Sequence, residues 1–103
     1  MTFVRACALS ELAEDCAKAV EVDGIAICLA RSQGEVTALL DECSHAEVAL
    51  SDGEVADGTV ECWLHGSRFD LRTGKPIGPP ATEAVKTYPV RIDGDDVYVA
   101  VKE

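Results

Sequence analysis

Positive charge is scarce in this sequence, and its scarcity excludes several classes of partner. The 103 residues include 9 lysines and arginines against 19 aspartates and glutamates, which gives a formal net charge of −10 at pH 7. Nucleic acids and anionic membranes attract basic surfaces, so neither is an expected partner. A protein with a basic surface is the partner that this charge favours.

Long apolar runs are also missing. No stretch approaches the ~18 apolar residues that a membrane-spanning helix needs, so no membrane span is expected. Residues 1–6 lack the basic and then apolar order of a signal peptide, which favours a cytoplasmic location. The length predicts a single domain, residues 1–103, and we expect a monomer.

Histidine occurs only twice, and each copy closely follows a cysteine. The first pair is Cys43 and His45, the second is Cys62 and His65, and the whole pattern is C-x-H-x16-C-x-x-H. Thiolates and neutral imidazoles are metal ligands. The sequence therefore predicts a metal centre held by Cys43, His45, Cys62 and His65.

The order of the ligands distinguishes between two kinds of metal centre. A structural zinc site usually takes its two cysteines from one segment and its two histidines from another. Here each segment supplies one cysteine and one histidine, as expected if each loop touches both metals of a two-iron cluster. The order favours one [2Fe–2S] cluster with two cysteines on one iron and two histidines on the other. A zinc site and a chance grouping are the alternatives.

Three cysteines are left over: Cys7, Cys16 and Cys28. Their odd number and scattered spacing argue against a disulfide framework. We expect them to be small buried apolar side chains.

The segments around the ligands resemble those of Rieske-type ferredoxins, the small electron carriers of bacterial aromatic-ring dioxygenase systems of the biphenyl and naphthalene type. The shared segments are residues 50–53, 61–62, 66–70, 73–75 and 86–90. The chain departs from the family at Trp63, where proline is common, and at Ala46-Glu47, where a glycine-containing pair is common. The resemblance implies a Rieske iron–sulfur fold and a role in aromatic hydrocarbon catabolism. It also implies two partners, an NAD(P)H-dependent flavoprotein ferredoxin reductase and a terminal oxygenase, between which the chain carries single electrons.

Other functions of Rieske proteins fit less well. A catalytic Rieske oxygenase needs two further histidines for a mononuclear iron, and none is left, so we expect an electron-transfer component and not an enzyme. Respiratory Rieske proteins have a disulfide that would fall at Val48 and Leu64, and neither is cysteine. A ferredoxin that serves another redox system or iron–sulfur metabolism is an alternative, as is a zinc-bound binding module.

The reduction potential is expected at the low end of the Rieske range of roughly −150 to +300 mV. Ser67 keeps a serine that donates to a cluster sulfur in high-potential relatives, although it could instead bond a turn backbone, and Phe69 replaces their tyrosine. The segment from Asp41 to Ser67 contains acids but no lysine or arginine, and a negative field opposes reduction. Trp63 is either the centre of a docking patch or a core residue.

Alternation of apolar and polar residues predicts an all-β fold. Strands are expected at 3–7, 17–22, 25–30 and 35–40, with turns at 23–24 and 32–34. Ser10 is expected to cap a helical turn at 10–14, and residues 84–92 and 96–101 to form a closing hairpin.

Turn signals crowd residues 41–80, where only short strands near 54–56 and 59–61 are expected. The proline-rich residues 76–80 are excluded from a central strand and form either a third loop or a connector. The predicted architecture is an antiparallel sandwich or barrel base, residues 1–40 and 81–103. Residues 41–80, termed here the inserted lobe, form the predicted cluster-binding part.

Overall fold

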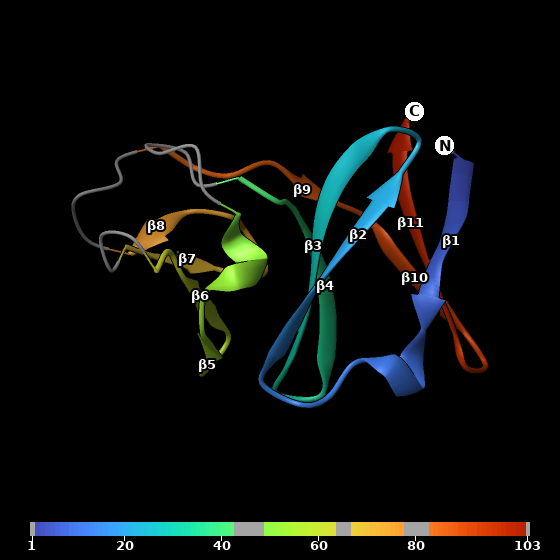
Figure 1. Ribbon diagram of the computed structural model, residues 1–103, viewed down its shortest axis with the longest axis horizontal. Helices are drawn as coiled ribbons and strands as arrows, with labels where there is room; N and C mark the ends of the chain where they lie inside the picture. The colour runs from blue at the N-terminus through green and yellow to red at the C-terminus, as the bar shows by residue number, and fades with distance from the viewer. Residues whose placement is uncertain (1, 43–48, 64–66, 78–82, 103) are drawn as a thin grey trace.

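The computed structural model describes residues 2–42, 49–63, 67–77 and 83–102. These residues form three antiparallel sheets that follow one another along the long axis of the molecule (Figure 1). No α-helix occurs in the described ranges, and none of their helices is long and apolar enough to cross a membrane. The all-β prediction is confirmed.

The base consists of two of these sheets. The outer sheet has the order β1-β11-β10, with bounds Thr2–Ala8, Asp96–Lys102 and Val90–Asp93. The middle sheet has the order β2-β3-β4-β9, with bounds Cys16–Val22, Ile25–Ser32, Glu35–Leu40 and Thr87–Tyr88. Two short 3-10 helices, Leu9–Glu11 (η1) and Leu50–Asp52 (η2), lie in the connections.

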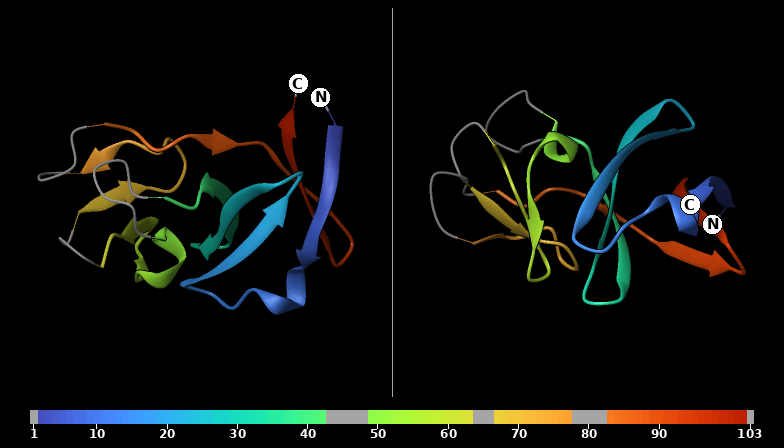
Figure 2. Two further views of the ribbon diagram at one scale, coloured as in Figure 1. Left: turned by 45° about the horizontal axis from the view of Figure 1, so that its top comes forward. Right: turned by 60° about the horizontal axis from the view of Figure 1, so that its bottom comes forward.

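The third sheet lies within the inserted lobe and is termed the lobe sheet. It has the order β5-β6-β7-β8, with bounds Val55–Ala56, Thr59–Glu61, Arg68–Asp70 and Pro76–Ile77. The two views of Figure 2 place the lobe sheet and the outer sheet on opposite sides of the middle sheet. β5 and β6 agree with the expected short strands.

The β2–β3–β4 meander forms as predicted because both of its turns fit the twist of the strands. Asp23 and Gly24 have φ of 50° and 79°, and Gln33 and Gly34 have φ of 54° and 74°. Two consecutive residues in the left-handed region make the turn that matches the right-handed twist of a hairpin. β4 has the expected bounds, Glu35–Leu40.

The middle sheet is covered on both faces, which explains the continuous apolar run in β3. Ile27 and Leu29 pack in a core with the outer sheet, whereas Cys28 and Ala30 pack in a second core with the lobe sheet. Successive side chains of a strand point to opposite faces, so one strand supplies both cores. The base is therefore a sandwich, and the lobe packs on the outside of its middle sheet.

The predicted closing hairpin forms between β10 and β11, but its first strand is not continuous over residues 84–92, because the chain changes sheets at Pro89. Tyr88 in β9 pairs with Ala38 of the middle sheet, and Val90 in β10 pairs with Val99 of the outer sheet. Proline has no N–H to donate to a ladder, so a break in pairing costs little there. The Pro89 carbonyl still accepts a bond from Ala100 N at 3.1 Å.

Two smaller expectations also change. Ser10 lies inside η1 and not at its cap, and it donates from N and Oγ to the Asp95 carboxylate, at 3.1 Å in each case. Pro76 and Ile77 form neither a loop nor a plain connector but edge strand β8, which pairs with β7. An edge position tolerates proline, in line with its exclusion from a central strand. Residues 78–80 lie outside the described ranges.

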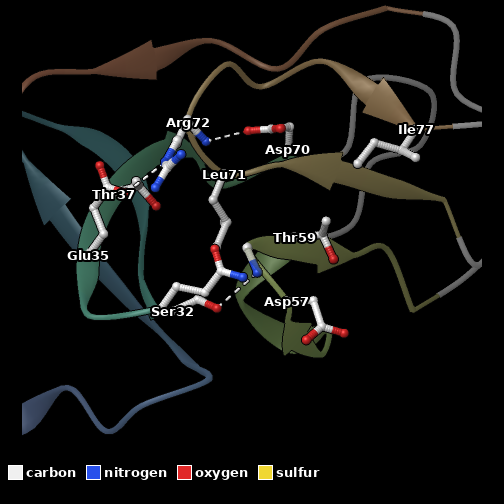
Figure 3. A pocket seen from close by; sticks show the side chains of 11 residues that line it. Ser32, Glu35, Thr37, Asp57, Thr59, Asp70, Leu71, Arg72 and Ile77 are labelled. Carbon is white, nitrogen blue, oxygen red and sulfur yellow. Dashed lines mark hydrogen bonds and ion pairs between the residues drawn. The ribbon is translucent and has the colours of Figure 1, made fainter.

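Hydrogen bonds join the lobe to the β3–β4 hairpin around the pocket of Figure 3. Ser32 Oγ donates to Asp15 Oδ1 at 2.9 Å and accepts from Gly58 N at 3.0 Å. Arg72 Nε donates to Glu35 Oε2 at 2.7 Å across the same boundary. Ser32 is buried, so its hydroxyl holds the two parts together away from water.

Ser32→Ala is expected to lower the free energy of unfolding by about 1–3 kcal/mol, because Gly58 N and Asp15 each lose a buried partner. Chemical denaturation of the cluster-loaded protein measures the change. Thr37→Val is the matched control at the same pocket, because the buried Thr37 Oγ1 has no hydrogen-bond partner among the described residues. The control is expected to change stability by less than about 0.5 kcal/mol. Equal losses in the two variants would contradict a structural role for the Ser32 bonds.

Candidate metal centre

The second predicted ligand loop is the connection between β6 and β7. Glu61, the last residue of β6, pairs with Arg68, the first residue of β7. Just beyond that pair, Cys62 N donates to the Ser67 carbonyl at 2.6 Å. Cys62 and Ser67 are both fully buried. The hairpin therefore fixes both ends of residues 62–67 and holds the Cys62 side chain in the lobe core.

The first predicted ligand loop follows β4, and an aspartate fixes its base. Asp41 N continues the ladder by donating to Ala26 O at 3.0 Å. The Asp41 carboxylate accepts from Ser51 N at 2.7 Å and from Ser51 Oγ at 2.6 Å. These bonds tie the end of β4 to η2 and hold the chain on both sides of residues 43–48. Aspartate often bonds nearby backbone in this way, but its spacing to Ser51 gave no sequence signal.

Of the four predicted ligands, Cys62 lies within the described residues, whereas Cys43, His45 and His65 lie outside them. In the described ranges, no three histidine, cysteine, aspartate or glutamate residues are grouped so that they could hold a metal ion. The described part of the chain thus contains no second candidate metal site.

The cysteines outside the predicted site differ in exposure. Cys7 and Cys28 are buried as expected, but Cys16 is exposed, so that part of the expectation is wrong. Burial, with a smaller effect of Asp41, raises the pKa of the Cys28 thiol to about 12. Metals bind the thiolate, so Cys28 is a poor ligand at neutral pH. Burial also raises the pKa of the Cys7 thiol.

Trp63 is exposed, with 54% of its surface accessible, so its interpretation as a core residue is wrong. It directly follows the buried Cys62. An apolar indole is therefore exposed directly beside the buried thiol of the proposed ligand. Ser67 is buried and takes part in an interaction beyond the bond that its carbonyl accepts from Cys62 N.

The Rieske [2Fe–2S] domain matches residues 2–89 of the chain. The chain belongs to this family. It is 43% identical over 100 residues to the biphenyl dioxygenase ferredoxin subunit of Pseudomonas sp. strain KKS102, a match covering 96% of this chain and 92% of the relative. These findings confirm the predicted family and its cofactor, one [2Fe–2S] cluster.

Solved structures of Rieske ferredoxins have the same fold. The ferredoxin of carbazole 1,9a-dioxygenase from Nocardioides aromaticivorans IC177 is similar with a TM-score of 0.91 and 38% identity, over 99% of this chain and 100% of that one. A ferredoxin solved in complex with the oxygenase of carbazole 1,9a-dioxygenase gives a TM-score of 0.89 at 28% identity, over 95% and 92%. These relatives are named as ferredoxins, in agreement with the predicted role of an electron-transfer component.

The described residues of this Rieske protein fit a cluster ligand at Cys62. Its thiol forms no disulfide, and it sits at a hairpin end that fixes its position. It is excluded from water, which protects an iron–thiolate bond from exchange. A buried thiol held rigidly in this way is what a permanently bound cluster requires.

Proposed function

We propose that this protein carries single electrons from an NAD(P)H-dependent flavoprotein ferredoxin reductase to the terminal oxygenase of an aromatic-ring dioxygenase system. The observation that carries the proposal is full-length similarity to ferredoxin components, one of which was solved bound to its oxygenase. Such a carrier acts in the cytoplasm as a monomer. Its single domain holds the cluster in the inserted lobe, residues 41–80.

The proposed ligands are Cys43 and Cys62 on one iron and His45 and His65 on the other. When bound, the cluster accepts and returns one electron at a time. Two thiolates and two neutral imidazoles give it less negative charge than four thiolates would, which eases reduction. Buried Ser67, five residues after Cys62, is the proposed hydroxyl donor to the reduced form.

The proposed docking surface is the groove beside Trp63. Its lining includes an exposed indole, an exposed thiol, three carboxylates without an ion pair in the described structure, and the ion-paired Glu61: Trp63, Cys16, Asp15, Asp52, Glu54 and Glu61. No lysine or arginine is among its described lining residues. An apolar centre with an acidic surround suits a basic partner, and complementary charge raises the association rate more than the affinity. A carrier that visits two partners in turn needs such fast, weak complexes.

The rate at which a biphenyl-type ferredoxin reductase and NADH reduce this protein is expected to fall as salt rises from ~50 to 500 mM, because salt screens steering charges. Stopped-flow absorbance measures the rate. Trp63→Ala is expected to slow reduction about tenfold at every salt concentration, whereas Asp52→Asn with Glu54→Gln is expected to weaken the salt dependence.

Asp93→Asn is the matched control, since it removes an exposed carboxylate from the outer sheet, away from the lobe (Figure 1). It is expected to change the rate by less than twofold. A rate insensitive to salt and to these substitutions would contradict the docking surface. Failure of the reductase to reduce the protein, or a midpoint potential well above about +150 mV, would contradict the carrier role itself.

A further inference from the structure

We propose that Arg68 sets the reduction potential of the cluster by cancelling the charge of Glu61 at the base of the second ligand loop. The proposal rests on the ligand role of Cys62 given above. It adds an electrostatic function to a pair of residues in the β6–β7 hairpin.

The pair is held in one geometry by several contacts. Glu61 and Arg68 are directly opposite in the β6–β7 register, and Arg68 Nη2 lies 3.0 Å from Glu61 Oε2. Arg68 Nη1 donates to Thr59 Oγ1 at 3.0 Å, and Thr59 Oγ1 donates to Ala56 O at 2.8 Å. Because Thr59 already restrains the Arg68 guanidinium, little further side-chain conformational freedom is lost when Arg68 pairs with Glu61. The ion pair is therefore expected to persist.

The two charges of the pair also flank the loop that begins with the proposed ligand Cys62. Glu61 immediately precedes Cys62, and Arg68 immediately follows Ser67. The bond from Cys62 N to Ser67 O, at 2.6 Å, brings the two ends of the loop together directly beyond the pair. Both charges therefore lie next to the backbone that positions Cys62.

Glu61 differs from the other described acids of the 41–67 segment because it has an ion-pair partner. Among the described acids between Asp41 and Ser67, only Glu61 forms an ion pair. The side chains of Arg68 and Glu61 are 38% and 31% exposed, so water screens them only in part. The acid next to Cys62 in the sequence is therefore the one whose negative field is cancelled by an ion pair.

Removing either partner leaves the other charge uncompensated. Reduction adds one negative charge to the cluster. An unbalanced Arg68 stabilises that charge, and an unbalanced Glu61 opposes it. The two single substitutions must therefore move the reduction equilibrium in opposite directions, whereas damage to the hairpin would move it the same way in both.

Spectroelectrochemical titration of the cluster-loaded protein tests this. Glu61→Gln is expected to raise the equilibrium constant for reduction by about three- to tenfold, and Arg68→Gln to lower it by a similar factor. At 59 mV per tenfold for one electron, these are shifts of roughly 30–59 mV. The double variant replaces a neutral pair by a neutral pair and is expected to return within about twofold of the parent.

Two controls complete the design. Glu35→Gln and Arg72→Gln break the ion pair that joins β4 of the base to the lobe, which is 2.7 Å long and lies at the pocket of Figure 3. Each is expected to change the equilibrium constant for reduction by less than twofold. Arg68→Lys keeps the charge and is expected to keep the parent value even if it loads less cluster. Equal shifts in Arg68→Lys and Arg68→Gln, shifts of one sign in both single glutamine variants, or a double variant that does not recover would overturn the proposal.

These results separate the inference from the function on which it rests. A parent protein without a Rieske spectrum would contradict the proposed cluster site. A normal spectrum with an unmoved potential in all glutamine variants would overturn only the role of Arg68.

Discussion

Cys62→Ser is expected to yield a colourless protein, whereas the parent contains about two iron and two acid-labile sulfide per chain. The Cys62 thiol is fully buried at the end of β6, and the hairpin bond from its N to Ser67 O fixes its place. A serine hydroxyl is protonated at neutral pH and harder than a thiolate, so it does not replace the soft ligand. Visible absorbance, iron and sulfide analysis, and the EPR spectrum of the reduced protein measure the loss.

Cys16→Ser is the matched control, because Cys16 is also free of disulfides but lies exposed at the start of β2. It is expected to retain the spectrum and the iron content of the parent. A coloured Cys62→Ser protein, or a colourless Cys16→Ser protein, would show that the proposed ligand set is wrong. A parent with stoichiometric zinc from iron-replete cells would favour the zinc alternative.

Gly53→Ala is expected to destabilise the inserted lobe by about 3 kcal/mol and to reduce the cluster content of the purified protein. A Cβ at residue 53 would fall on the backbone carbonyl of Glu61 and close to Leu50 O. Backbone cannot rotate away as a side chain does, so Glu61, the neighbour of Cys62, would have to move. Chemical denaturation followed by cluster absorbance measures the change.

Gly34→Ala provides the contrast, because a Cβ there meets nothing within 4 Å. Gly34 has φ of 74°, so alanine costs about 1–2 kcal/mol from the backbone alone. Gly53 has φ of −89°, which any residue adopts, so its cost is purely steric. The control is expected to keep full cluster content. Equal cluster loss in both variants would contradict the close contact with Glu61.

The sequence predicted the fold well where local chemistry decides the outcome. Asp23-Gly24 and the turn at 32–34 carry left-handed residues, and the strands beside them formed at the expected positions. Prediction failed where contacts with residues distant in the sequence determine the local structure. Residues 84–92 read as one strand because alternation does not reveal that Pro89 divides two sheets. Ser10 looked like a cap, but Asp95, far along the chain, takes its hydrogen bonds.

At the candidate site, too, local patterns were predictable from the sequence and distant contacts were not. The ligand spacing is a local pattern and predicted the family that the comparison confirms. The exposure of Trp63 depends on which face of the loop the lobe covers, which local sequence does not encode. The structural role of Asp41 depends on contacts with Ser51, and the proposed role of Arg68 depends on its contact with Glu61. Cys43, His45 and His65 lie outside the described residues, and their ligand roles stay predictions.

The lobe joins the base through two neighbouring strands, and this bears on how a cluster is inserted. The chain leaves the base from β4 and returns to it in β9; Leu39 pairs with Thr87, and Leu40 N donates to Lys86 O at 2.9 Å. An insertion attached by two adjacent strands can open without unpairing either sheet of the base. We therefore expect the base to stay folded if the lobe opens during iron–sulfur assembly. Opening would uncover the apolar side chains of Cys28, Ala30 and Leu39, so a chain awaiting its cluster is the state most exposed to aggregation.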